Sequence, residues 1–173
     1  MNRNVEIKSR VESLEAIAAR VRELADEGPV VLVQEDTFFR CPHGRLKLRQ
    51  FAHGRPAELI YYERSDETEP KESRYAIHRT TDPLGLQAVL SATLGVRAVV
   101  RKRRTLYLIG ATRVHLDRVE GLGEFVELEV VLAPDQQVAE ATATARVLME
   151  KLGIPEDALV RGAYVDLLEA GSV

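Results

Sequence analysis

Hydrophobic and polar residues alternate along most of this chain, with the two-residue period of a β-strand. The stretch RNVEIKSR shows the pattern first, because Asn4, Glu6 and Lys8 fall on one face of an extended chain. Val5 and Ile7 fall on the other face. Turn sequences such as CPHG and HGRP separate the alternating stretches. The pattern predicts eight strands, at residues 3–9, 30–40, 44–52, 57–64, 72–79, 97–109, 112–118 and 124–132.

Four other stretches have the apolar spacing and the end signals of helices. In SLEAIAARVRELADEG an apolar stripe runs from Leu14 to Leu24, and Gly28 predicts the end of the helix. In TDPLGLQAVLSATLG, Asp82 is the predicted N-cap and Gly95 the predicted end. The last two helices are predicted over residues 134–153 and 154–168.

The order of these elements predicts an α+β fold. Eight strands joined mostly by short links indicate an antiparallel meander that closes into a β-barrel, with helices beside it. A chain of 173 residues is long enough for one such domain, and no linker, repeat or low-complexity segment divides it. We expect a single domain over residues 1–173.

Composition narrows the function classes only a little. The formal net charge of −3 is close to neutral and argues against a nucleic-acid coat protein or a membrane-surface protein. Cys41 is the only cysteine, so no intramolecular disulfide can form. The N-terminal residues lack a signal-peptide pattern and no apolar run is long enough to span a membrane, so we expect a cytoplasmic protein.

The later strands carry their charges on one face. The residues that share a face are Arg45, Lys47 and Arg49; Lys102 and Arg104; Arg113, His115 and Asp117; and Glu127 and Glu129. Any one such face could simply meet solvent, as in a half-buried sheet. The signs are sorted, however, because basic residues dominate three strands whereas carboxylates gather on the last.

If the barrel closes, its first and last strands could be neighbours, which would bring Glu6, Glu127 and Glu129 together. Such a concentration of like charge is costly unless a cation lies there. Carboxylate oxygens without a Cys or His cluster favour Mg²⁺ or Mn²⁺ over Zn²⁺. Basic side chains beside such a metal are what a polyphosphate requires. The polar faces would then line the inside of the barrel and meet a ligand.

Several motifs, taken in order, resemble those of the CYTH superfamily of triphosphate tunnel metalloenzymes, especially its class IV adenylyl cyclase-like branch. NVEIK is similar to that family's Glu-x-Glu-x-Lys strand. The motifs that follow it in order are QEDTFF, LKLR, RKRRTLY, HLDRVEGLGEFVELEV and AYVDLL, so that the resemblance covers nearly the whole chain. It implies an eight-stranded tunnel that binds triphosphate compounds and needs a divalent metal, Mg²⁺ or Mn²⁺.

The resemblance also implies roles for individual residues. The implied catalytic residues are Glu6, Lys8 and Asp117, the implied metal ligands are Asn4, Glu6, Glu127 and Glu129, and the implied phosphate contacts are Lys8, Lys47, Arg49, Arg64, Lys102, Arg104 and Arg113. Gln34 and Asp36 could serve to orient basic neighbours. A homodimer is expected from relatives in the cyclase branch.

Two positions depart from the family pattern. Asn4 stands where the motif begins with Glu, and its neutral amide oxygen is a poorer Mg²⁺ ligand than a carboxylate. Glu63 stands where many members carry a tunnel Lys, with Arg64 next to it, so one phosphate contact is missing or displaced by a residue. Both departures weaken the case for catalysis more than the case for binding.

The leading hypothesis is metal-dependent hydrolysis of a triphosphate compound, either inorganic triphosphate or a nucleoside or thiamine triphosphate. The alternatives are an adenylyl cyclase that converts ATP to cyclic AMP and pyrophosphate, and a tunnel that binds triphosphate or polyphosphate without turnover. Nucleic-acid binding is not expected, because alternation splits the basic run 101–104 between two faces and no aromatic platform accompanies it. His115 is expected to be a strand histidine whose hydrogen bonds are satisfied.

Overall fold

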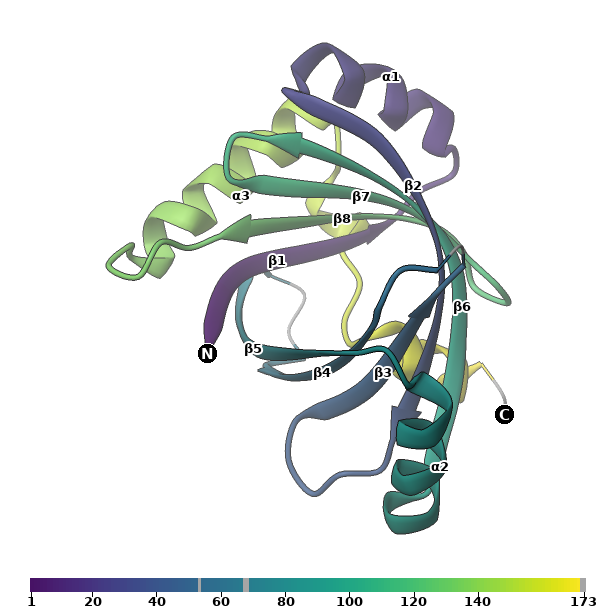
Figure 1. Cartoon of the computed structure of the whole chain (residues 1–173). Helices are drawn as coiled ribbons and strands as arrows, with labels where there is room; N and C mark the ends of the chain where they lie inside the picture. The colour runs from purple at the N-terminus through teal and green to yellow at the C-terminus, as the bar shows by residue number, and fades with distance from the viewer. Residues whose placement is uncertain (53, 67–68, 172–173) are drawn as a thin grey trace.

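The computed structural model describes residues 1–52, 54–66 and 69–171, and in them eight antiparallel strands close into one barrel, as predicted (Figure 1). The strands are β1 (Asn2–Arg10), β2 (Glu27–Phe39), β3 (Arg45–Phe51), β4 (Ala57–Arg64), β5 (Lys71–Thr80), β6 (Val96–Ile109), β7 (Thr112–Val119) and β8 (Gly123–Val131). The helices are α1 (Leu14–Leu24), α2 (Pro83–Leu94), α3 (Val138–Leu152) and α4 (Tyr164–Ala170). None of these helices has the length and apolar character that crossing a membrane requires.

The strand order is not that of a simple meander. Around the barrel it runs β1-β5-β4-β3-β2-β6-β7-β8, so that β1 pairs with both β5 and β8. The runs β2 to β5 and β6 to β8 are meanders, but α1 intervenes between β1 and β2, and α2 between β5 and β6. The meander prediction is therefore wrong at these two links, whereas closure between the first and last strands is confirmed.

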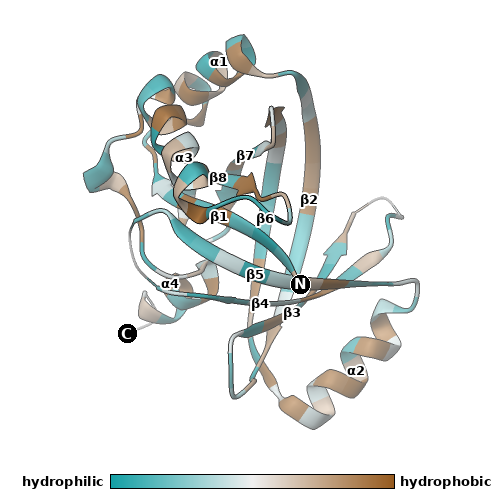
Figure 2. Cartoon of the chain, turned by 90° about the vertical axis from the view of Figure 1, so that its left-hand side faces the viewer, coloured by the Kyte–Doolittle hydropathy of each residue, from teal (hydrophilic) through white to brown (hydrophobic). Residues whose placement is uncertain are grey.

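The largest hydrophobic cluster lies outside the barrel, because the inward faces of the strands are largely polar. Ile7 on β1 and Leu128 on β8 point outward and are fully buried under α1 and α3. Val21 of α1 and Leu152 of α3 belong to the same cluster. Figure 1 shows both helices on the side of β1, β7 and β8, and Figure 2 shows their apolar residues. The helices are thus needed to bury the outer face of this wall.

The first two helices begin where the sequence predicts, but the first one ends early. Gly28 is not the stop of α1: the helix ends at Leu24, and Gly28 lies in β2 with a φ of 114°. In that conformation glycine is favoured because it lacks a Cβ atom. At α2 the predicted cap is confirmed, since Asp82 accepts a hydrogen bond of 3.0 Å from the Gly85 amide.

The predicted helix over residues 154–168 is wrong for most of its length. A short 3₁₀ turn covers Glu156–Ala158, and α4 starts only at Tyr164. The extended chain between them is fastened to β1, because the Val160 amide donates to the Lys8 carbonyl at 2.9 Å. This connection brings α4 to one end of the barrel.

The outer cluster predicts where substitutions destabilise the fold. Leu152→Ala should lower the free energy of unfolding by about 2–5 kcal/mol, because it leaves a cavity in a fully buried site. Leu84→Ala is the control, since Leu84 is 74% exposed on α2, and it should change stability by less than about 0.5 kcal/mol. Urea unfolding followed by circular dichroism measures both values. Equal effects of the two substitutions would contradict this placement of the core.

Candidate functional site

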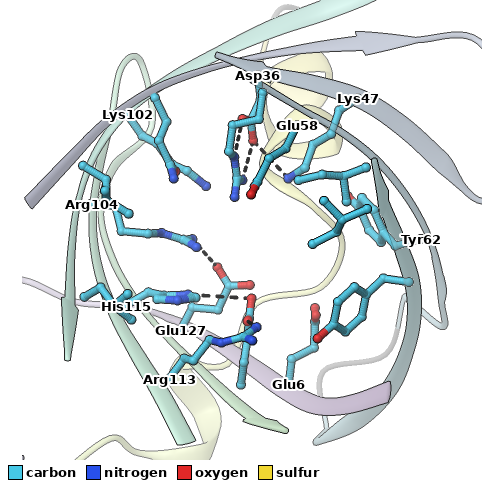
Figure 3. Close-up of a pocket in the computed structure, with 18 of the residues that line it drawn as sticks. Glu6, Asp36, Lys47, Glu58, Tyr62, Lys102, Arg104, Arg113, His115 and Glu127 are labelled. Carbon is cyan, nitrogen blue, oxygen red and sulfur yellow. Dashed lines mark hydrogen bonds and ion pairs between the residues drawn. The ribbon is translucent and has the colours of Figure 1, made fainter. Parts of the chain in front are cut away.

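The barrel encloses a cavity of about 810 Å³, within the size range of ligand sites (Figure 3). The side chains that line it come from all eight strands and from the start of α4. The predicted site residues that line it are Asn4, Glu6, Lys8, Lys47, Arg49, Arg64, Lys102, Arg104, Arg113, Glu127 and Glu129. Asp117 is the one predicted site residue outside this lining.

Asp36 on β2 holds two of the basic side chains in place. Its carboxylate accepts hydrogen bonds from Lys47 Nζ at 3.0 Å and from Arg49 Nε at 2.7 Å, both from β3. Burial alone would raise the pKa of Asp36, but Arg49 and Lys47 outweigh it and hold that pKa well below its usual range. Asp36 therefore stays ionised and fixes the direction of both cations, as expected of an orienting residue.

Asp117 on β7 holds Arg104 on β6 in place in the same way. It is fully buried and accepts hydrogen bonds from Arg104 Nε at 2.7 Å and from the Tyr164 hydroxyl at 2.8 Å. It lies on the same face of β7 as Arg113 and His115, but behind the cavity lining, because Arg104 and Tyr164 cover its oxygens. Asp117 is therefore suited to position Arg104, and its role in catalysis stays a prediction.

Burial makes two lysines of the cavity sensitive to pH near neutrality. Burial, and next the charge of Arg104, lowers the pKa of Lys102 to about 7. Burial and Arg49 lower the pKa of Lys47 to about 8. A buried ammonium group costs free energy unless an anion is close. The binding of a polyanion would thus favour the charged forms of both lysines.

The chain around α4 covers one end of the cavity. Lys8 Nζ lies 4.1 Å from the centre of the Tyr164 ring and donates to the Gly162 carbonyl at 3.4 Å. Lys102 Nζ lies 5.0 Å from the same ring centre. Arg64 also donates to the Gly162 carbonyl, at 3.0 Å. The ammonium groups of Lys8 and Lys102 thus both lie against the ring of Tyr164.

The register of β4 resolves the departure at Glu63. Glu63 is exposed and accepts a hydrogen bond from Tyr61, whereas Arg64 points into the cavity. A basic side chain therefore lines the cavity one residue after Glu63, and its contact with phosphate stays a prediction. Arg64 forms an ion pair with Glu6, so this carboxylate is directed towards β4.

Carboxylates from the first and last strands lie near an imidazole from β7. Glu6 on β1 lies directly across from Glu129 on β8, as the strand order predicts. The group whose ligand atoms come within 4.8 Å of one another consists of His115, Glu127 and Glu129. The expected hydrogen-bonded role of His115 is wrong, because its Nδ1 atom is buried without a hydrogen bond.

These residues fit a divalent cation. Burial alone would raise the pKa of Glu127, but Lys8 and Arg104 hold it well below its usual range, so the carboxylate is ionised. Burial alone would raise the pKa of Glu129, but neighbouring cationic groups that include Arg104 and Arg113 outweigh it and lower that pKa. The amide oxygen of Asn4 is buried in the cavity lining and has no hydrogen bond. Ionised carboxylates and an unpaired amide oxygen are the ligands that Mg²⁺ and Mn²⁺ prefer.

The opposite end of the cavity is more apolar than the sequence pattern suggested. Its lining there includes Val30, Leu32, Phe51, Ile77, Leu106 and Leu108. Val30 is 45% exposed and Ile77 is 43% exposed, as expected of side chains at an opening. The alternation pattern does not identify these positions as cavity residues. An apolar residue in an alternating strand is normally assigned to the face that packs against the hydrophobic core, which in this barrel is the outer face.

Nearly the whole chain is similar to known proteins. The sequence model of the CYTH domain family matches residues 2–164 of this chain. Adenylate cyclase CyaB of Aeromonas hydrophila is 25% identical over 156 residues, which cover 76% of this chain and 82% of CyaB.

Two solved structures share the fold. The PH1012 protein of Pyrococcus horikoshii OT3 superposes with a TM-score of 0.86, at 26% identity, covering 95% of this chain and 98% of that one. HpAC1 of Hippeastrum, for which a dominant triphosphatase activity is described, has a TM-score of 0.70 at 15% identity, covering 99% of this chain and 96% of its own. At that identity the second similarity shows the fold alone.

Lys102 predicts a link between anion binding and proton uptake. At about pH 8 the ligand-free side chain is mostly neutral, and bound tripolyphosphate should raise its pKa, so that binding takes up protons and weakens as pH rises through 7 to 8. Calorimetric titration in two phosphate-free buffers of different ionisation enthalpy measures that uptake. Lys102→Arg keeps the charge permanently and should take up fewer protons. The same proton count in both proteins would contradict the prediction.

Proposed function

This chain belongs to the CYTH domain family, and from that premise we propose that it binds a triphosphate compound inside its barrel and hydrolyses it with the help of a divalent cation. The observation that carries the proposal is the separation of charge across the cavity. Lys47, Arg49, Lys102 and Arg104 come from β3 and β6, on either side of β2. Glu6, Glu127 and Glu129 come from β1 and β8, which lie opposite in the closed strand order (Figure 3).

A triphosphate chain matches this separation. Its non-bridging oxygens carry several negative charges that the basic side chains can neutralise by charge-assisted hydrogen bonds. Asp36 and Asp117 hold Arg49 and Arg104 in fixed directions, so little reorganisation is needed on binding. Lys8 and Arg64 add positive charge at the end covered by Tyr164. The phosphates would therefore lie in the half of the cavity that α4 closes.

Glu127 and Glu129 would hold the cation, with Asn4 close by on the neighbouring strand. Both carboxylates already meet arginines, because Arg104 donates to Glu127 at 3.0 Å and Arg113 donates to Glu129 at 3.4 Å. When bound, a divalent cation there would add positive charge beside these arginines for the phosphate oxygens. Glu6 is paired with Arg64 and would act by placing that arginine.

In the hydrolytic reaction a water molecule attacks the terminal phosphorus. An oxygen–phosphorus bond forms, the bridging bond on the far side breaks, and orthophosphate separates from the shortened chain. The basic side chains stabilise the charge that develops on the leaving oxygen. The carboxylates of β8, Glu127 and Glu129, are suited to orient the water, because they line the cavity beside the proposed cation.

The apolar opening favours adenylyl cyclisation as the second candidate function. Leu32, Leu106 and Ile77 could contact a nucleoside, which inorganic triphosphate lacks. The similarity to CyaB of Aeromonas hydrophila points the same way. In that reaction the ribose 3′-hydroxyl attacks the α-phosphorus and pyrophosphate leaves, so the same phosphate contacts serve both reactions and only the attacked phosphorus differs.

Phosphorus NMR of ATP and of inorganic triphosphate, each incubated with the protein and Mg²⁺ or Mn²⁺, distinguishes the two functions. Hydrolysis is expected to release orthophosphate. A cyclase would instead give pyrophosphate and a cyclic monophosphate from ATP. Substrates that shift on binding but stay intact would overturn both and indicate a binding tunnel, the reading that Asn4 supports.

Glu127→Gln tests the carboxylate side of the cavity. It keeps the size of the side chain but removes its charge, so metal-dependent turnover should fall by on the order of 100-fold or more. Glu35→Gln is the matched control, because Glu35 lies on the outer face of β2 and pairs with Arg101. Steady-state release of phosphate measures both variants. Full activity in Glu127→Gln would exclude this residue from the reaction.

A further inference from the structure

His115 lies beside two carboxylates of the cavity and makes no hydrogen bond through Nδ1. The exposed fraction of His115 is 4%, and the unpaired Nδ1 atom is itself buried. The closest charged oxygen, Glu129 Oε1, is 3.7 Å away, which is too long for a hydrogen bond. A buried polar atom without a partner is costly and indicates that a partner binds there.

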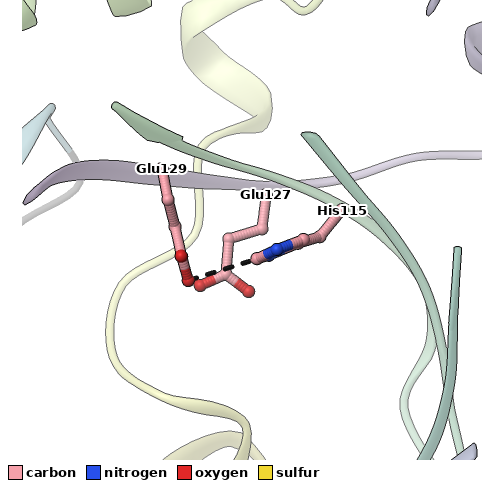
Figure 4. A group of neighbouring side chains, drawn as sticks. All are labelled: His115, Glu127 and Glu129. Carbon is pink, nitrogen blue, oxygen red and sulfur yellow. Dashed lines mark ion pairs between the residues drawn. The ribbon is translucent and has the colours of Figure 1, made fainter. Parts of the chain in front are cut away.

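The backbone holds His115 and the two glutamates on one rigid platform. His115 on β7 lies directly across from Glu127 on β8, and Glu129 follows two residues later on the same face. Figure 4 shows the three side chains converging on one point between the strands. Strand pairing fixes these positions before any ligand arrives, which is the arrangement that favours tight coordination.

The distances within this platform suit a single ion. The ligand atoms of the three residues lie within 4.8 Å of one another. Metal ions hold nitrogen and oxygen ligands at about 2.0–2.2 Å, so two ligands on opposite sides of one ion lie about 4.4 Å apart. Small rotations of the side chains would therefore close the group around an ion.

We infer that His115 is a nitrogen ligand of the divalent cation, and that this nitrogen shifts the preference of the site from Mg²⁺ towards Mn²⁺. The inference rests on the proposed function, which assigns the cation to Glu127 and Glu129. Mg²⁺ prefers oxygen ligands in near-ideal octahedral geometry, whereas first-row transition ions also accept imidazole and bind mixed sites more tightly. The polar alternation of β7 cannot reveal this role, because it does not show which neighbours His115 meets.

Pulsed EPR of the full chain loaded with Mn²⁺ alone tests the inference directly. A bound imidazole nitrogen couples to the electron spin of Mn²⁺, and this coupling is expected in the wild type. His115→Ala should abolish it, whereas His78→Ala should retain it, because His78 is exposed on β5. A wild type without nitrogen coupling, or coupling that persists in His115→Ala, overturns the inference whether or not the variant is stable.

A competition titration supplies a second readout. His115→Gln retains a polar side chain, and the ratio of Mn²⁺ affinity to Mg²⁺ affinity should fall about tenfold or more. An unchanged ratio overturns the inference. Both readouts are independent of turnover: nitrogen coupling without phosphate release would refute only the proposed function, and phosphate release without coupling would refute only the role of His115.

Discussion

The pairing of charges across neighbouring strands is the constraint on which this barrel depends. A carboxylate inside a protein costs several kcal/mol unless a cation or hydrogen bonds compensate. Asp36 is compensated by Lys47 and Arg49 from the next strand, and Asp117 by Arg104 from the next strand. These pairs are oriented by strand register, so the basic side chains have fixed directions before a ligand arrives. The same pairs that make a charged interior tolerable therefore also prepare it to bind an anion.

A charged interior forces the hydrophobic core to the outside. One outer wall, formed by β1, β7 and β8, is covered by α1 and α3, and there Leu128 and Leu152 are fully buried. The chain after α3 then crosses to β1 and delivers Tyr164 to the end of the cavity. The elements that stabilise the barrel from outside thus also close it. Stability and site geometry are coupled through the same segment.

The sequence predicts which strands line the site better than it predicts which side chains contact one another there. Period-two alternation places Asn4, Glu6 and Lys8 on one face without any knowledge of the fold, and the sorting of charge by sign suggests which strands meet. It cannot show which of two adjacent charged residues points inward. At Glu63 and Arg64 the choice depends on the register of β4, where a shift of one residue exchanges the two faces.

Other misses have the same origin in three-dimensional context. Gly28 carries a helix-stop signal, yet it lies near the start of β2, where the pairing with β6 shifts register between Glu27 and Val30 and the glycine has a positive φ. His115 has the pattern of an ordinary strand residue. Only its neighbours on β8, Glu127 and Glu129, distinguish it from other residues of β7. The apolar residues of the opening, such as Leu32 and Leu106, look like core residues because hydrophobic alternation does not show which side is enclosed.

The cavity is polarised along its length as well as across it. Along β6 the inward residues pass from Lys102 and Arg104 to Leu106 and Leu108, so charge gives way to apolar surface within one strand. A ligand made of phosphates alone would use only the charged half, and the apolar half would then be left to water. A ligand with an organic group on its phosphate chain would use both halves, because burying that group removes apolar surface from water. Within the proposed function, this apolar lining argues for an organic triphosphate rather than the inorganic ion.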